Sequence, residues 1–109
     1  TGDLPEMKSA MAVELGKGPA VKVMDRSVIC TPAVVDALEQ AAKDCGVSAQ
    51  REILLCGGTD TSALQKARAG VRAGAVSIPT RYIHSPSELC AVSDVEDAAK
   101  LLTQYALQK

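Results

Sequence analysis

Apolar and polar positions along the chain predict short strands that alternate with helices. The alternating stretch 20–25 is typical of a strand, and the stretch 50–56, which contains the apolar run ILL at 53–55, predicts a second. Residues 73–79 are short and apolar enough to form a third strand that is buried on both faces. The weaker alternation over 10–15 favours one further strand.

The clearest helical pattern covers residues 32–45, where apolar side chains recur at the spacing of one helix face. Thr31 stands at the N-cap position and Pro32 suits the first turn. Gly46 is typical of the residue that follows the end of a helix. These signals predict where the helix begins and where it ends.

Two more helices are expected, a short one over 62–70 and a longer one over 93–109. The longer helix begins with Ser93 and Glu96, which have the spacing of a capping box. Strands that alternate with helices through short connections predict an α/β fold, in which helices cover a largely parallel sheet. No repeat or linker divides the chain, so we expect a single domain.

Composition narrows the class of protein. The 109 residues are 47% hydrophobic and 23% charged, which is typical of a soluble globular domain. The 12 basic and 13 acidic residues leave a net charge of −1 with no basic run, so neither nucleic acid nor an anionic membrane is an expected partner. No apolar run approaches the roughly 20 residues of a membrane span, and no signal peptide is visible. The first residues, TGD, lack an initiator Met, which predicts a fragment or a processed chain.

The cysteines show no CxxC pair and no framework of a small secreted protein, which favours free, mostly buried thiols in a reducing cytoplasm. They are Cys30, Cys45, Cys56 and Cys90. Cys56 paired with His84 as a nucleophile is the alternative, although Cys56 follows an apolar run in which a core thiol would be ordinary.

Two loops follow predicted strands, and in α/β sheets binding sites gather at the carboxyl ends of strands. The first loop, GGTDTS over 57–62, allows close backbone approach to an anion or a peptide carboxylate. It also fits a tight turn in which Asp60 or Thr61 caps the next helix. Both interpretations stay open on the pattern alone.

The second loop holds His84, the single histidine of the chain. A metal site needs further ligands, since zinc takes about four, and the nearby acids Asp25, Asp60 and Glu88 have no diagnostic spacing. From the residues alone, His84 is either a metal ligand or a hydrogen-bonded structural histidine.

Three motifs resemble, in order and spacing, the C-terminal part of metallopeptidase family 42. They are KVMDRS (22–27), CGGTDTSALQ (56–65) and SIPTRYIHSP (77–86). The family comprises tetrahedral aminopeptidases, among them glutamyl and deblocking aminopeptidases, and its members are sometimes labelled endoglucanases. The stretches LGKGPAVKVMD and SDVEDAAKLL are similar to the family too, so the resemblance covers nearly the whole chain.

The resemblance implies a three-layer α/β/α zinc-peptidase-like fold, of which residues 1–109 are the C-terminal portion of the catalytic domain. It implies a cytoplasmic, homo-oligomeric enzyme that uses two divalent metal ions, zinc or cobalt, to hydrolyse N-terminal residues from peptides. His84 corresponds to a metal ligand. Gly57, Gly58, Thr59 and Asp60 correspond to a loop that borders the substrate pocket.

The departures from the family pattern limit what this chain is expected to do. The family's other histidine, its bridging aspartate, its paired glutamates and its inserted β-rich domain belong to earlier parts of the chain. Its remaining aspartate ligand precedes a loop similar to Gly2-Asp3-Leu4-Pro5, and Cys56 stands where a third glycine is common. We therefore expect the 109 residues alone to be inactive and to hold no metal tightly. A non-catalytic α/β module that binds a peptide or a partner is the main alternative, and an anion- or nucleotide-binding unit is a more distant one.

Overall fold

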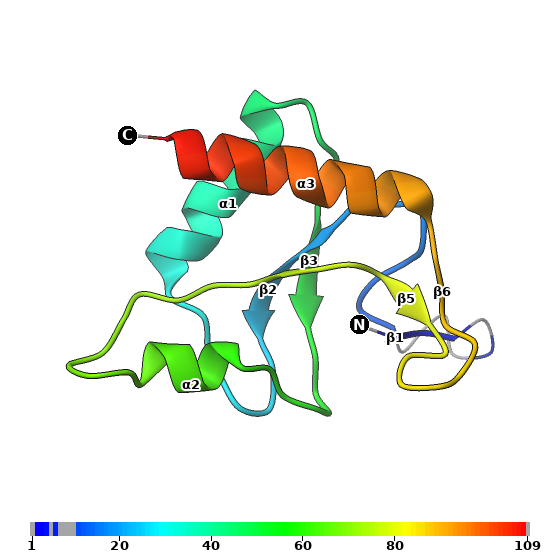
Figure 1. Ribbon diagram of the computed structural model, residues 1–109, viewed down its shortest axis with the longest axis horizontal. Coiled ribbons are helices and arrows are strands. Elements are labelled where there is room, and N and C mark those ends of the chain that lie inside the picture. The colour runs from blue at the N-terminus through cyan, green and yellow to red at the C-terminus, as the bar shows by residue number, and fades with distance from the viewer. Residues whose placement is uncertain (1, 5, 7–10, 109) are drawn as a thin grey trace.

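The computed structural model describes residues 2–4, 6 and 11–108. Its elements, in chain order, are β1 (Gly2–Asp3), β2 (Ala20–Met24), α1 (Pro32–Asp44), β3 (Gln50–Ile53), α2 (Thr61–Gln65), β4 (Val76–Ser77), β5 (Thr80–Arg81), β6 (Leu89–Cys90) and α3 (Val92–Leu107) (Figure 1). The expected mixture of α and β elements is confirmed. No helix within the described ranges is both long and apolar enough to cross a membrane.

The described strands form two small sheets, in the orders β3-β2-β4 and β1-β5-β6. β2 and β3 are parallel, and α1 makes the crossover between them. β4 is antiparallel to β2, which corrects the expectation of a largely parallel sheet at this position. In the second sheet β5 is parallel to β1 and antiparallel to β6.

The predicted strand over 73–79 is only two residues long, and these residues are half-buried. Gly74 lies against α1, where an added Cβ would come within 2.6 Å of Val34 Cγ1, so the chain before β4 follows the helix. Pro79 has no N–H to donate to a ladder, and beyond it the chain passes into β5 of the other sheet. The strand therefore ends early, and it is not buried on both faces.

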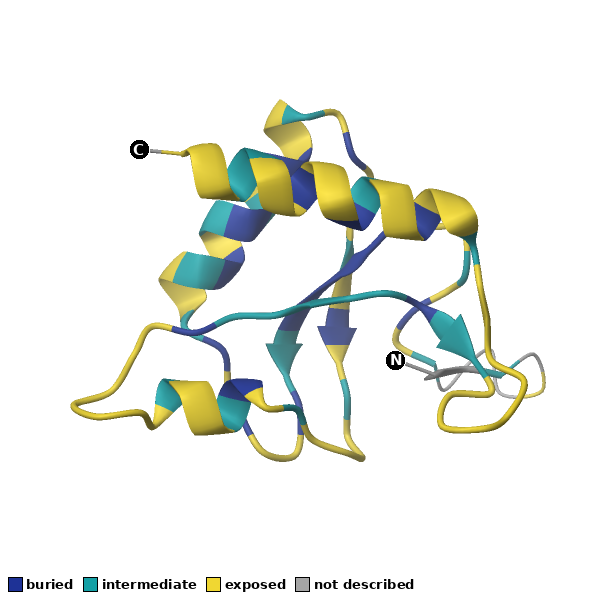
Figure 2. Ribbon diagram, in the orientation of Figure 1, coloured by how far each residue is buried: buried dark blue, intermediate teal, exposed yellow. Residues whose placement is uncertain are grey.

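α1 and α3 pack on one face of the β3-β2-β4 sheet. Val21 of β2, Leu38 of α1 and Leu101 of α3 belong to one apolar cluster, and Leu101 is fully buried. Figure 2 shows buried residues on the facing sides of the two helices and along β2. Because side chains alternate along a strand, this arrangement turns Lys22, the neighbour of Val21, toward the opposite face.

The boundaries of α1 agree with the sequence, but one capping contact differs. The helix begins at Pro32 and is followed by Gly46, whose φ of +70° is the left-handed value that favours glycine. Thr31 occupies the N-cap position without a side-chain cap, because its Oγ1 accepts a hydrogen bond from Ala73 N at 3.1 Å. Thr31 thus ties the start of α1 to the chain before β4.

The start of α3 corrects the capping-box prediction. Ala91 is the N-cap residue, and Ser93 lies inside the helix. The buried carboxylate of Asp94 accepts hydrogen bonds from Gly16 N (2.8 Å) and Gly18 N (3.0 Å), so it binds a distant turn instead of its own helix end. This contact docks the 16–18 turn on α3.

Three other sequence-predicted elements are shorter than expected or absent. Residues 11–15 contain no strand, and residue 10 lies outside the described residues. β3 stops at Ile53 instead of residue 56. α2 stops at Gln65 instead of residue 70, because the chain continues in separate turns in which Arg68 has a φ of +52°.

The 16–18 turn yields a stability prediction. Gly18 has a φ of +90°, and a Cβ added there would lie 1.7 Å from the backbone oxygen of Ser48. We expect Gly18→Ala to lower the free energy of unfolding by about 2–4 kcal/mol, from backbone strain and steric overlap together. Urea denaturation measures the change. Gly16→Ala is the matched control, because Gly16 also has a positive φ but faces open space, so its loss should be about 1 kcal/mol. Equal losses at both positions would contradict the steric argument.

Candidate functional site

The 57–60 loop follows β3 and packs closely on the loop that follows β2. Gly57 has a φ of +87°, and its carbonyl accepts a hydrogen bond from Arg26 N at 3.1 Å. An added Cβ on Gly58 would lie 2.8 Å from Ser27 Oγ, so only glycine fits this approach without a shift. Gly58 is therefore required by the contact between the two loops, and Gly57 is required by its left-handed backbone.

The end of the 57–60 loop leads directly into α2. Asp60 holds the N-cap position, yet its side chain makes no capping bond, and its backbone oxygen accepts from Ala63 N and Leu64 N. Ser62 donates both its backbone N–H and its hydroxyl to the oxygen of Thr59. The turn interpretation is supported by these bonds, although neither expected side chain caps the helix. The five-residue helix that follows is too short to add evidence for an anion site.

Asp25 is the centre of the hydrogen bonds below this loop. Its Oδ1 accepts from Ser27 N (2.7 Å), Ser27 Oγ (2.7 Å) and Val28 N (3.0 Å). Its Oδ2 accepts from Thr59 Oγ1 at 2.9 Å. Burial by itself raises the pKa of Asp25, but the hydrogen bonds from Ser27 and Thr59 and the charge of Lys22 outweigh burial, so the pKa lies below the ordinary aspartate value.

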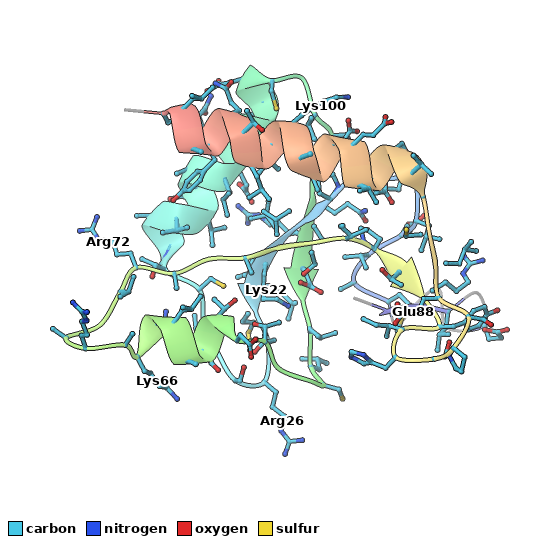
Figure 3. All side chains as sticks on the ribbon, viewed as in Figure 1. Lys22, Arg26, Lys66, Arg72, Glu88 and Lys100 are labelled. Atoms are coloured by element: carbon cyan, nitrogen blue, oxygen red, sulfur yellow. The ribbon has the colours of Figure 1, made fainter. Side chains whose placement is uncertain are left out.

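A buried ion pair lies next to Asp25. Lys22 Nζ is 2.6 Å from Glu52 Oε2 and 3.7 Å from Asp25 Oδ2, and all three side chains are almost completely buried. Ser77 of β4 donates its hydroxyl to Glu52 Oε2 at 2.8 Å. In Figure 3 Lys22 lies in the interior, whereas Arg26 and Lys66 extend away from the molecule. Sequence reasoning missed this cluster, although a lysine between Val21 and Val23 of a buried strand was its signal.

His84 lies in the loop between β5 and β6, and it is exposed. Two residues of this loop have left-handed backbones, Tyr82 with a φ of +56° and His84 with a φ of +63°. Ser85 N donates to the oxygen of Tyr82, and His84 N donates to Glu88 Oε1 at 2.5 Å. The turn therefore holds the His84 backbone in an uncommon conformation and presents the imidazole at the surface.

The cysteines are free, as expected, but most of them are not buried. Cys30 is buried, and burial raises the pKa of its thiol. Cys45 is half-buried, and Cys56 and Cys90 are exposed, because Cys56 lies beyond the end of β3 and Cys90 lies in the short strand β6.

The two candidate loops share one end of the molecule but are anchored differently. Figure 1 shows both at the end toward which β2 and β3 point. The hydrogen bonds described above tie the 57–60 loop to Asp25 and Ser27, and they tie the His84 turn to its own loop. Among residues 2–4, 6 and 11–108, no group of three or more His, Cys, Asp or Glu side chains is placed to hold a metal ion. His84 fits a divalent metal as one ligand, and a complete site needs donors from elsewhere.

Residues 1–101, which include both loops, match the family of M42 glutamyl aminopeptidases. The chain belongs to this family. A protein of Acetivibrio thermocellus, whose name places it among candidate aminopeptidases, is 48% identical over 104 residues, which are 95% of this chain and 31% of that protein.

Solved structures of M42 peptidases have the same fold. The TET aminopeptidase of a marine sediment Thaumarchaeota archaeon superposes with a TM-score of 0.88 at 33% identity, over 95% of this chain and 29% of that one. The TET1 peptidase of Pyrococcus horikoshii, which can assemble into a tetrahedron or a large octahedral shell, gives a TM-score of 0.80 at 32% identity, over 89% of this chain and 28% of that one. These structural similarities agree with the expectation that this chain is a C-terminal portion of the three-layer α/β/α fold. The M42 chain described here spans about a third of the length of these relatives.

The lowered pKa of Asp25 predicts how stability depends on pH. The carboxylate of Asp25 binds a proton less tightly in the folded state than in the unfolded chain. Its ionised form therefore stabilises the fold above about pH 4, and this stabilisation is lost as the pH falls further. We expect Asp25→Asn to lower the free energy of unfolding by about 1–3 kcal/mol at pH 7, and by less at pH 3. Urea denaturation between pH 3 and pH 7 measures the loss of stability at each pH. Asp36→Asn, on the exposed side of α1, is the control. A loss that stays constant down to pH 3 would exclude ionisation of Asp25 as its cause.

Proposed function

We propose that residues 1–109 are the C-terminal portion of the catalytic domain of a metal-dependent aminopeptidase, which hydrolyses N-terminal residues from peptides. The observation that carries this proposal is the M42 match over residues 1–101, with both candidate loops inside it. The chain spans 31% of the Acetivibrio relative, so the activity belongs to the whole protein and the 109 residues alone are proposed to be inactive. The upstream half of the catalytic domain and the inserted β-rich domain lie outside these residues.

His84 is proposed as a ligand of one of two divalent metal ions, zinc or cobalt. A neutral imidazole suits either ion, and the exposed turn leaves the ring free of core packing. Glu88 holds the backbone of the turn through His84 N, so its proposed role is to fix the direction from which the imidazole approaches. When bound, the metals supply Lewis acidity toward the scissile carbonyl and lower the pKa of a water.

The 57–60 loop is proposed to border the bound peptide. Gly57 and Gly58 are exposed, and without Cβ atoms their peptide groups can approach a substrate backbone closely. Thr59 and Asp60 complete the loop. We propose that this loop orients the substrate and does not bind metal.

The partners follow from the same proposal. Peptides are the substrates, and further copies of the protein are the expected binding partners, since the TET1 peptidase of Pyrococcus horikoshii can assemble into closed shells. The near balance of charge gives no support for nucleic acid or membrane binding. We propose a cytoplasmic location.

Replacing His84 tests the metal assignment. In the full-length protein, His84→Ala should remove about one metal ion per chain and nearly all hydrolysis of aminoacyl-nitroanilides, because a ligand is lost. The melting temperature of the apo protein should stay within a few degrees, since His84 is exposed. Elemental analysis and steady-state kinetics measure the two effects, with Ser87→Ala in the same loop as the control.

Unchanged metal content in His84→Ala would assign the imidazole a structural role. If the unmodified full-length protein neither binds metal nor hydrolyses any aminoacyl substrate, but does bind peptides, the chain is instead part of a non-catalytic binding module.

Replacing Gly58 tests the role of the 57–60 loop. A side chain at this position meets Ser27, so the loop must shift. We expect Gly58→Val to lower kcat/KM by about 10- to 100-fold, mainly through a higher KM, with unchanged metal content, since about 1.4 kcal/mol corresponds to each factor of ten. Gly46→Ala, at a positive φ in open space after α1, is the control. Loss of metal in Gly58→Val would mean that the loop supports the metal ligands, and unchanged kinetics would leave it as a plain turn.

A further inference from the structure

One continuous set of polar contacts beneath the surface joins the 57–60 loop to β4, the strand that precedes the segment carrying His84. We call this set the Lys22 network, and its members are Lys22, Asp25, Glu52, Thr59 and Ser77. It includes residues of β2, β3 and β4 and of the loops after β2 and β3. Thr59 lies in the substrate-side loop, and Ser77 lies in β4, seven residues before His84 in the chain, so the network reaches one part of the candidate site directly and the other only through the chain that follows β4.

The contacts can be followed from one end to the other. Thr59 Oγ1 donates to Asp25 Oδ2 at 2.9 Å, and the same oxygen lies 3.7 Å from Lys22 Nζ. Lys22 Nζ lies 2.6 Å from Glu52 Oε2, which also accepts the hydroxyl of Ser77 at 2.8 Å. A displacement at either end therefore changes the surroundings of Lys22.

The chain between Ser77 and His84 gives little room for independent movement. Pro79 is buried and conformationally restricted, and β5 is paired on both sides, with β1 and with β6. His84 follows three residues after β5. Fixing Ser77 therefore restricts the segment that presents the imidazole.

Stability is a poor explanation for a cluster of this kind. Removing a lysine and two carboxylates from water is costly, and well-packed apolar residues in place of a buried ion pair are often as stable or more stable. The cluster instead provides directional contacts, which fix the relative positions of the groups that make them. A buried network between the 57–60 loop and β4 is better suited to positioning these segments than to stabilising the fold.

We propose that the Lys22 network is a positioning device that fixes the 57–60 loop relative to the segment from β4 to His84. Its effect on catalysis rests on the proposed aminopeptidase function, whereas its effect on the loop does not. Asp25 and Glu52 are buried below the loops, so they act through Thr59 and Ser77 and not by touching substrate. They are positioning residues.

A double-mutant cycle in the full-length protein tests the catalytic effect. Thr59→Val and Ser77→Ala each remove one hydroxyl from opposite ends of the network, and each should lower kcat/KM at least threefold, mainly through KM, with metal content unchanged. The kcat/KM of the double variant should be at least threefold higher than the value obtained by multiplying the two single losses. The reason is that the free-energy effects of mutations within one network do not add. Thr59→Ser should restore activity, and Thr103→Val, which removes a hydroxyl on the exposed side of α3, should have no effect. Multiplicative losses would overturn the proposed coupling.

Amide hydrogen exchange tests the network without relying on activity. In Ser77→Ala, the amides of residues 57–60 should exchange at least twofold faster than in the unmodified protein, while those of α3 stay unchanged. Unchanged exchange at 57–60 would overturn the proposal. If the unmodified protein shows no aminopeptidase activity, the proposed function fails, and the exchange experiment still decides whether the network positions the loop.

Lys22→Met is the obvious variant, but it leaves two carboxylates buried without their cation and is expected to unfold the protein. The hydroxyl variants avoid this difficulty, because Ser77→Ala and Thr59→Val remove no charge. Their melting temperatures should remain close to that of the unmodified protein, which makes changes in exchange at the 57–60 loop interpretable as local.

Discussion

The contact between Lys22 and Glu52 determines much of the arrangement around it. The two residues face each other in the parallel register of β2 and β3, and their ion pair lies on the face opposite α1 and α3. Because an unpaired charge there would be very costly, the register of the two strands is restricted to the one that brings ammonium and carboxylate together. Asp25 follows one residue after β2 and closes the cluster, so the loop after the strand is fixed by the same constraint.

Carboxylates fix the turns of this protein more than helix caps do. Asp25 accepts two backbone N–H groups of its own loop, and Asp94 accepts two from a turn more than seventy residues away in the chain. Ionised acceptors form stronger hydrogen bonds than neutral ones, and buried N–H groups need a partner. The apolar core packs the helices on the sheet, and these buried acids determine where the connecting turns lie.

Local signals in the sequence were sufficient for α1, since its start, its apolar face and its terminal glycine all lie within the helix or beside it. They were insufficient at the start of α3, because Asp94 contributes to a distant turn that no local pattern reveals. The two-residue strands β4, β5 and β6 exist through pairing with remote segments, so their own composition could not define them. At the candidate site, the positions of His84 and of the 57–60 loop at strand ends could be predicted. The buried cluster could not, because a single Lys22 in an apolar strand does not indicate which acid it meets.

The bond between Asp94 and the 16–18 turn has a consequence for biosynthesis. Its partners are 76 and 78 residues apart, so the turn cannot reach its final state until the ribosome has passed the start of α3. At about 5–20 residues per second, the delay is on the order of 4–16 s. β2, α1 and β3 lie within residues 20–53 and can associate during this interval. The nascent chain thus exposes the apolar face of α1 until α3 arrives, which makes this period of synthesis the one most open to aggregation or to binding by a chaperone.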